Sequence, residues 1–165
     1  MLPVAFYDSL SSNPLSAIRN RQCALLVAAA LFVLSGCQRE APKIEPIAYG
    51  SATCARCESV IRDPAFAAQS RYAGGRVKVF DDPGCLVKSL ADESEPPRHM
   101  FFRDHTAEKW LASGEVWFAS TAKAASPQKY GWAAFSDFGA AQDAVGRAGG
   151  GEILQFEQLK QRLSK

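Results

Sequence analysis

The chain has little excess of charge of either sign. Among its 165 residues, 19 are Lys or Arg and 17 are Asp or Glu, which gives a formal net charge of +2 at pH 7. Proteins that bind nucleic acid usually carry a strong and clustered basic excess. The mixed and balanced charge therefore argues against a nucleic-acid partner, and against attachment to a membrane by electrostatics alone.

Sequence patterns of the common enzyme classes are also missing. No glycine-rich phosphate loop follows a predicted strand, because the glycines at 149–151 precede one and are typical of a helix stop. The two histidines do not form a paired metal motif, and no serine stands in the nucleophile pattern of hydrolases. We therefore expect an accessory protein rather than an enzyme.

Long hydrophobic runs are absent as well. Residues 23–34 form an apolar run of 12 residues behind Arg19 and Arg21, which is too short for a resident membrane span and typical of a signal-peptide core. The run ends in Leu-Ser-Gly-Cys37, which resembles the bacterial lipobox; an ordinary secretory signal is the alternative. We expect residues 1–36 to be removed, Cys37 to carry lipid, and residues 37–50 to act as a tether.

This signal predicts a cell-envelope lipoprotein that faces the periplasm. The lipid on Cys37 would hold it on the membrane, since each buried CH₂ group of an acyl chain contributes about 0.8 kcal/mol. Gln38 after the lipidated cysteine resembles a sorting residue for the outer membrane.

Beyond residue 50, short extended segments alternate with short helical ones. Residues 71–80 are typical of a hairpin with Gly74-Gly75 at its turn, and residues 81–93 of a helix that Asp82 caps and Pro83 begins. Further strands are expected at 98–104, 114–120, 129–135 and 152–156, a second capped helix at 136–151, and an amphipathic tail at 157–165.

Two of these segments repeat one another. "VFDDPGCLVKSL" at 79–90 and "AFSDFGAAQDAV" at 134–145 align without gaps at an offset of 55, with Phe, Asp and Gly identical at the strand end, the cap and the first helical turn. We interpret this as an α+β fold of two similar strand–strand–helix units, about 51–95 and 96–165, packed together. One irregular α+β domain is the alternative.

The count of thiols in the mature chain is odd. Cys23 is lost with the signal and Cys37 carries lipid, so Cys54, Cys57 and Cys85 remain in an oxidising compartment. One disulfide would leave a free thiol, whereas three thiolates around one soft metal ion leave none. Cys85 is expected in the first turn of its helix, where the positive end of the helix favours a thiolate; a small buried core cysteine is the alternative.

Other donors are scarce. Met100 suits copper and the histidines His99 and His105 suit zinc, but on a strand His99 and Met100 point to opposite faces, so at most one of them faces a given site. Asp81, Asp82 and Asp104 are expected to be capping and turn residues. The predicted ligands are Cys54, Cys57, Cys85 and Met100, for Cu(I) or alternatively for zinc.

The ordered set of motifs resembles the NosL family, which consists of accessory lipoproteins for the maturation of nitrous oxide reductase. A lipobox, a tether and Cys-x-x-Cys are followed by "VFDDPGCL", "MFFRDHTAEKWLASGEVWFAS", "SPQKYGWAAFSDFGAAQDAV" and "GGGEILQF". The resemblance covers about residues 31–158. It implies two related α/β units that bind Cu(I) and pass it within the periplasm towards the assembly of the reductase.

Two positions depart from the pattern of that family. Its members commonly carry Met two residues after the second Cys of the motif, where this chain has Ser59, and Pro-Met-Gly before the last strand and helix, where it has Pro127-Gln128-Lys129. We therefore expect a divergent member whose copper site depends on the three cysteines and Met100. The expected recipient is a copper enzyme or its assembly machinery, and nitrous oxide reductase is the one that the resemblance implies.

Two other interpretations of the Cys-x-x-Cys motif stay open. One is thiol–disulfide redox chemistry, although Pro64 follows the motif too soon for the long helix of a thioredoxin. The other is a disulfide-stapled lipoprotein that binds another protein through Trp110, Trp117 and Trp132, which are otherwise expected in the core.

Overall fold

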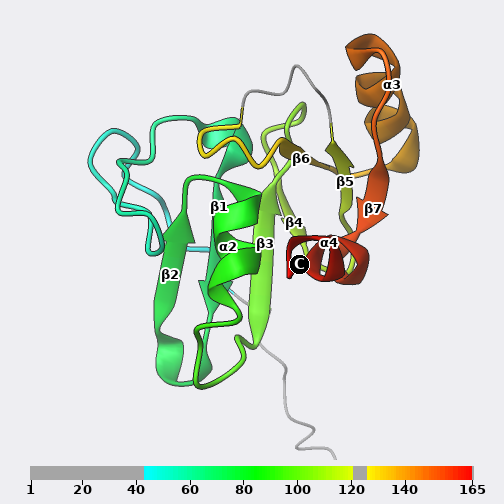
Figure 1. Cartoon of the computed structure of the whole chain (residues 1–165). Helices are drawn as coiled ribbons and strands as arrows, with labels where there is room; N and C mark the ends of the chain where they lie inside the picture. Colours follow the sequence, from blue (N-terminus) through cyan, green and yellow to red (C-terminus); the bar gives the residue numbers. More distant parts are fainter. Residues whose placement is uncertain (1–42, 121–125, 165) are drawn as a thin grey trace, which may run out of the picture. The chain divides into compact units, whose positions relative to one another are not determined.

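A computed structural model describes residues 43–120 and 126–164 of the chain, shown in Figure 1. The predicted signal, Cys37 and the first part of the tether lie outside these residues. Two antiparallel sheets organise the described part, one with the strand order β2-β1-β3-β4 and one with the order β6-β5-β7. No helix within residues 43–120 and 126–164 is long and apolar enough to cross a membrane.

The first sheet contains the predicted hairpin. β1 (Ala68–Arg71) and β2 (Val77–Phe80) pair in antiparallel register, and the turn between them contains Gly74 and Gly75 at φ of 73° and 84°, which glycine adopts without strain. β3 (His99–Arg103) pairs with the other edge of β1, and β4 (Trp110–Ala112) pairs with β3.

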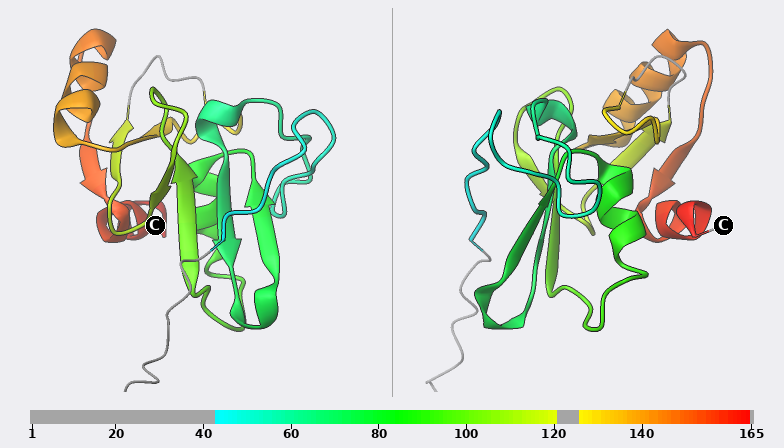
Figure 2. Two further views of the ribbon diagram at one scale, coloured as in Figure 1. Left: turned by 180° about the vertical axis from the view of Figure 1, so that it is seen from behind. Right: turned by 60° about the vertical axis from the view of Figure 1, so that its left-hand side comes forward.

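Helix α2 (Pro83–Ser89) begins directly after β2. The Asp82 side chain accepts a hydrogen bond from the Gly84 backbone N–H at 2.7 Å and caps the helix, as the sequence predicts. Figure 2 shows the first sheet with α2 against one face and the N-terminal segment against the other. The cap therefore determines where the first turn of α2, with Cys85 in it, leaves the end of the sheet.

The second unit repeats this arrangement. β5 (Trp117–Ser120) lies between β6 (Trp132–Phe135) and β7 (Ile153–Gln155), and α3 (Phe138–Ala148), capped by Asp137 and ended at Gly149, packs on this sheet. The predicted amphipathic tail is a helix, α4 (Phe156–Leu163), which contacts α2, β5 and β7.

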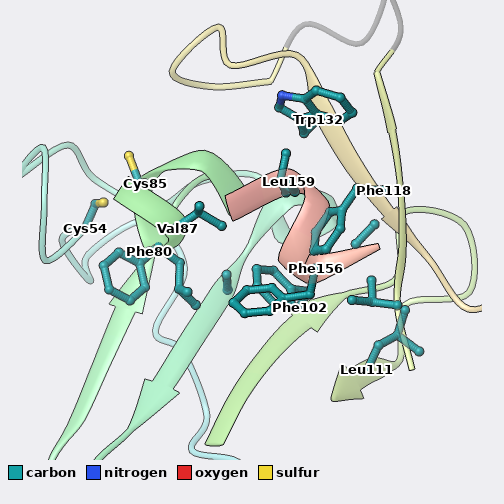
Figure 3. Packing of buried hydrophobic residues seen from close by; sticks show 14 of the residues in the cluster. Cys54, Phe80, Cys85, Val87, Phe102, Leu111, Phe118, Trp132, Phe156 and Leu159 are labelled. Carbon is teal, nitrogen blue, oxygen red and sulfur yellow. The ribbon is translucent and has the colours of Figure 1, made fainter. Parts of the chain in front are cut away.

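The two sheets share one hydrophobic core, which Figure 3 shows from close by. Phe102 of the first sheet meets Phe118 of the second edge to face, with ring centroids 4.8 Å apart. The prediction of an α+β fold built from strand–strand–helix units is thus confirmed. The sequence placed the boundary between the two units between residues 95 and 96. In the structure β3 and β4 join the first sheet, so the division between the two sheets falls between β4 and β5.

The segment 43–50, which the sequence assigns to the tether, is attached to the domain. The Gln69 side chain is fully buried and exchanges two hydrogen bonds with the Glu45 backbone, at 3.1 and 3.2 Å. Arg71 donates to the Lys43 carbonyl, and Ile47 packs against the main core. These contacts attach residues 43–50 to the folded domain.

Candidate metal centre

A tight loop presents Cys54 and Cys57. Thr53 and Val60 form an isolated antiparallel bridge at its base, and the Cys54 N–H donates to the Ser59 carbonyl at 2.8 Å. Glu58 completes the turn with a positive φ of 61°. The loop closes so sharply that both thiols of the Cys-x-x-Cys motif stay near the end of the first sheet.

Backbone hydrogen bonding holds this loop against the sheet. The Ala55 N–H donates to the Val79 carbonyl of β2 at 2.8 Å, which brings the loop to the point where β2 ends and α2 begins. The sulfurs of Cys54, Cys57 and Cys85 and a carboxylate oxygen of Asp81 all lie within 4.8 Å of one another. Figure 3 shows Cys54 and Cys85 side by side at the edge of the core.

Asp81 was expected to be a capping or turn residue; it lies in the bend between β2 and α2, but its side chain does not cap the helix. Its neighbour Asp82 caps α2, while the Asp81 carboxylate, 2% exposed, accepts a hydrogen bond from the Cys57 thiol at 3.4 Å. A helix has one N-cap, so two consecutive aspartates at one strand end leave a spare carboxylate. That surplus, four residues before Cys85, is the sequence signal that could have revealed the role of Asp81.

The three thiols differ in their access to solvent. Cys54 and Cys85 are each 1% exposed, while Cys57 is half-buried. Cys57 and Cys85 line a cavity of about 470 Å³, and its wall also contains Arg56 and Lys78. These two cations are paired with acidic side chains of the same wall, Asp92 and Glu93. Cys57 is therefore the thiol that an incoming molecule reaches first.

Hydrogen bonding between the thiols separates their pKa values. The hydrogen bond from Cys85 outweighs burial and, with backbone N–H groups of the loop, lowers the pKa of Cys54 to about 6. The same bond raises the pKa of Cys85, with burial adding to the effect, and burial raises the pKa of Cys57. At neutral pH the free site thus holds one ionised sulfur, on Cys54, which attracts a cation.

A segment of the second unit closes over the site. The Gln128 side-chain amide donates to Asp81 at 2.8 Å and to the Ser59 hydroxyl at 3.3 Å, and its backbone N–H donates to Asp82. Ser59 and Gln128 occupy the two positions where the resemblance to NosL leads us to expect methionine. The two departures thus lie at one place, where a hydrogen-bonded polar pair supports Asp81.

The structure places Met100 and the histidines elsewhere in the fold. Met100 of β3 is opposite Ser70 of β1 and packs against the main core. Because β1 lies between β3 and β2, the Met100 backbone is two strand spacings, about 9–10 Å, from β2. His99 is exposed on β3, and His105 packs between Phe66 and Phe135. Among the described residues, neither histidine belongs to a cluster of potential metal ligands.

The fold and the site together define a small α+β domain with three thiols and a carboxylate gathered at one sheet end. This fold is that of NosL: the crystal structure of the copper chaperone NosL from Shewanella denitrificans matches it with a TM-score of 0.60 at 15% sequence identity, covering 71% of this chain and 96% of that one. No family model matches the chain, and a comparison with curated proteins finds no match. At this identity the likeness concerns the fold alone.

Proposed function

We propose that this protein binds Cu(I) at Cys54, Cys57 and Cys85 and passes it by ligand exchange to a copper enzyme or its assembly machinery. The observation that carries the proposal is the convergence of three free thiols from the loop and from α2, with all pairs of donor atoms within 4.8 Å. Thiolates are preferred ligands of Cu(I). The protein acts as an accessory factor rather than as an enzyme.

The unequal burial of the thiols supports transfer by exchange. Cys54 and Cys85 are buried, whereas Cys57, at the wall of the open cavity, is only half-buried. A soft donor of a recipient protein enters through the cavity and replaces Cys57 first, while the two buried sulfurs still hold the ion. Further exchange then releases the ion, and copper stays in the Cu(I) oxidation state in every step.

We further propose that the protein works at the cell envelope, anchored by lipid on Cys37 and facing the periplasm, most simply from the outer membrane. Lys43, whose carbonyl accepts a hydrogen bond from Arg71, is six positions after Cys37 in the chain. An extended chain of that length reaches about 20 Å, so the domain would stay close to the lipid surface. The resemblance makes nitrous oxide reductase the first recipient to test.

Metal titration tests the binding proposal. The full chain with Cys23→Ser and Cys37→Ser retains only the three site thiols, and under anaerobic conditions it should take up one Cu(I) in competition with bicinchoninate. Cys57→Ser, Cys54→Ser and Cys85→Ser should each weaken Cu(I) binding by more than about 100-fold. Loss of a residue that only supports a metal ligand typically lowers metal affinity by about 10–100-fold, and loss of the ligand itself should cost more. Undiminished affinity of all three variants refutes the site.

Lipid attachment is tested on the unmodified chain. Palmitate labelling and sedimentation with membranes should be lost in Cys37→Ser and kept in Cys23→Ser. Equal labelling of the two variants contradicts the anchor.

Deletion of the gene in a host that makes nitrous oxide reductase should leave that enzyme short of copper if it is the recipient.

The geometry disfavours the redox alternative. Disulfide exchange needs an accessible thiolate, but the thiol with the lowered pKa, Cys54, is buried, and the accessible thiol, Cys57, has a raised pKa. We therefore expect no reduction of insulin by the reduced protein, and rapid reduction would favour the redox function.

A further inference from the structure

We propose that Asp81 is a metal ligand and that it gives the site a second binding mode, in which Cys54, Cys57, Cys85 and Asp81 surround one tetrahedral divalent ion such as Zn(II). This inference rests on the proposed function, because the same three sulfurs serve both modes. In the Cu(I) mode the sulfurs bind and the carboxylate does not. The site thus distinguishes the two ions by one oxygen atom.

The two oxygens of Asp81 have different surroundings. Oδ2 accepts a hydrogen bond from the Gln128 amide at 2.8 Å. Oδ1 faces the sulfurs, and its hydrogen-bond donor is the Cys57 thiol at 3.4 Å. The carboxylate is 2% exposed, so the Gln128 contact holds the group in place while Oδ1 stays directed at the thiols.

The spacing of the donor atoms suits a tetrahedral ion. Zn–S bonds of about 2.3 Å and Zn–O bonds of about 2.1 Å place sulfur and oxygen about 3.5 Å apart, and two sulfurs about 3.8 Å apart, on a tetrahedron. The distance from Cys57 Sγ to Asp81 Oδ1 is 3.4 Å. Since all donor pairs lie within 4.8 Å, no pair has to close by more than about 1.3 Å around a zinc ion.

Charge separates the two modes. An ion that binds Cys57 displaces its proton, and Oδ1 then faces an anionic sulfur with nothing positive between them. A divalent ion placed between the two atoms binds both and removes this repulsion, because carboxylate oxygen is an ordinary zinc ligand. Cu(I) prefers sulfur and has weak affinity for carboxylate oxygen, so in the Cu(I) mode the repulsion persists. The carboxylate therefore favours the divalent ion and opposes the monovalent one.

Asp81 cannot easily turn away from the site. Besides the hydrogen bond from Gln128, the ring of Tyr130 packs so closely on Gly84 that an added Cβ there would lie 2.3 Å from the ring. Gln128 and Tyr130 both belong to the segment that closes over the site from the second unit. The packing of Tyr130 on Gly84 holds this segment, and with it the Gln128 amide that binds Asp81, against the start of α2.

The test compares two ions in one pair of variants. The full chain with Cys23→Ser and Cys37→Ser, and the same chain with Asp81→Asn, are titrated anaerobically with Zn(II) against a chromophoric chelator and with Cu(I) against bicinchoninate. Asp81→Asn should lower Zn(II) affinity at least about tenfold and leave Cu(I) affinity unchanged or increased. Co(II) bound to the parent chain should show the strong visible bands of four-coordinate geometry, and these should weaken in Asp81→Asn.

Two further variants complete the design. Asp81→Cys, which supplies a fourth thiolate, should restore Zn(II) affinity and increase the sulfur-to-Co(II) charge-transfer absorption. Asp104→Asn removes another fully buried carboxylate away from the thiols and should change neither affinity. Unchanged Zn(II) affinity in Asp81→Asn, or equal losses for Zn(II) and Cu(I), overturns the role of Asp81. Failure of the parent chain to bind Cu(I) instead refutes the proposed function, so the two failures are distinguishable.

Discussion

Replacement of Gly84 by alanine sets two effects of opposite sign against each other. Gly84 lies in the first turn of α2, one residue before Cys85, and its φ is not positive, so alanine fits the backbone. Helix propensity alone would favour Gly84→Ala by up to about 1 kcal/mol. However, the new Cβ would lie 2.3 Å from Cγ and 2.6 Å from Cβ of Tyr130.

The steric effect should win. The atoms that the new methyl group meets are the base of the Tyr130 side chain rather than its flexible end, so the segment that carries Tyr130 and Gln128 must move. Overpacking of this kind costs about 1–3 kcal/mol, and after the gain in propensity we expect a net loss of stability of up to about 2 kcal/mol. The shift also loosens the contact of Gln128 with Asp81, so Zn(II) affinity should fall more than Cu(I) affinity.

Urea unfolding of the metal-free protein measures this effect, with an unchanged slope expected. The repeat supplies a matched control, because Gly139 occupies the corresponding position 55 residues later and an added Cβ there meets only the Asp137 carboxylate, at 3.2 Å. Gly139→Ala should therefore cost much less stability. In a Tyr130→Gly background, Gly84→Ala should become neutral or stabilising. A Gly84→Ala protein as stable as the parent chain would refute the reasoning.

Two pH-dependent properties follow from the buried acids. With the pKa of Cys54 lowered to about 6, the metal-free protein should show one thiolate by ultraviolet absorbance at pH 7.5, and this absorbance should be absent in Cys54→Ser. The ionisation of Cys54 also stabilises the folded state. Its contribution is complete above the ordinary thiol pKa and is lost as the pH falls through 6. Burial opposes ionisation of Asp104, but hydrogen bonds from Ala107, Thr106 and Ser136 prevail and lower its pKa to about 2. Stability should therefore fall by about 2 kcal/mol between pH 4 and pH 2, and Asp104→Asn should remove that part of the acid sensitivity; an identical acid profile for the variant would contradict this assignment.

The fold could be predicted from short-range patterns. Asp82 with Pro83, and Asp137 fifty-five residues later, mark the starts of two helices because a carboxylate satisfies backbone N–H groups within its own segment. The hairpin follows from glycines that accept positive φ. These features depend on residues a few positions apart, so the sequence alone determines them.

Long-range contacts explain what the sequence analysis missed. β3 joins the first sheet because it pairs with β1, about thirty residues earlier, and no local pattern specifies that partner. The segment 43–50 has the composition of a linker, but it is held by a buried amide, Gln69, whose two hydrogen bonds are made only in the folded sheet.

The site shows the same division. Counting thiols predicted that Cys54, Cys57 and Cys85 share one metal ion, because one disulfide among three cysteines would leave a free thiol in the oxidising compartment that the sequence predicts. Three other features depend on how a loop, a helix end and a segment of the second unit meet. Asp81 lies beside the thiols, Gln128 holds Asp81 in place, and Met100 lies two strands away. The sequence determined which side chains have the chemistry to bind a soft ion, whereas the tertiary structure decided which donor atoms are close enough to share it, because a metal bond forms only over about 2 Å.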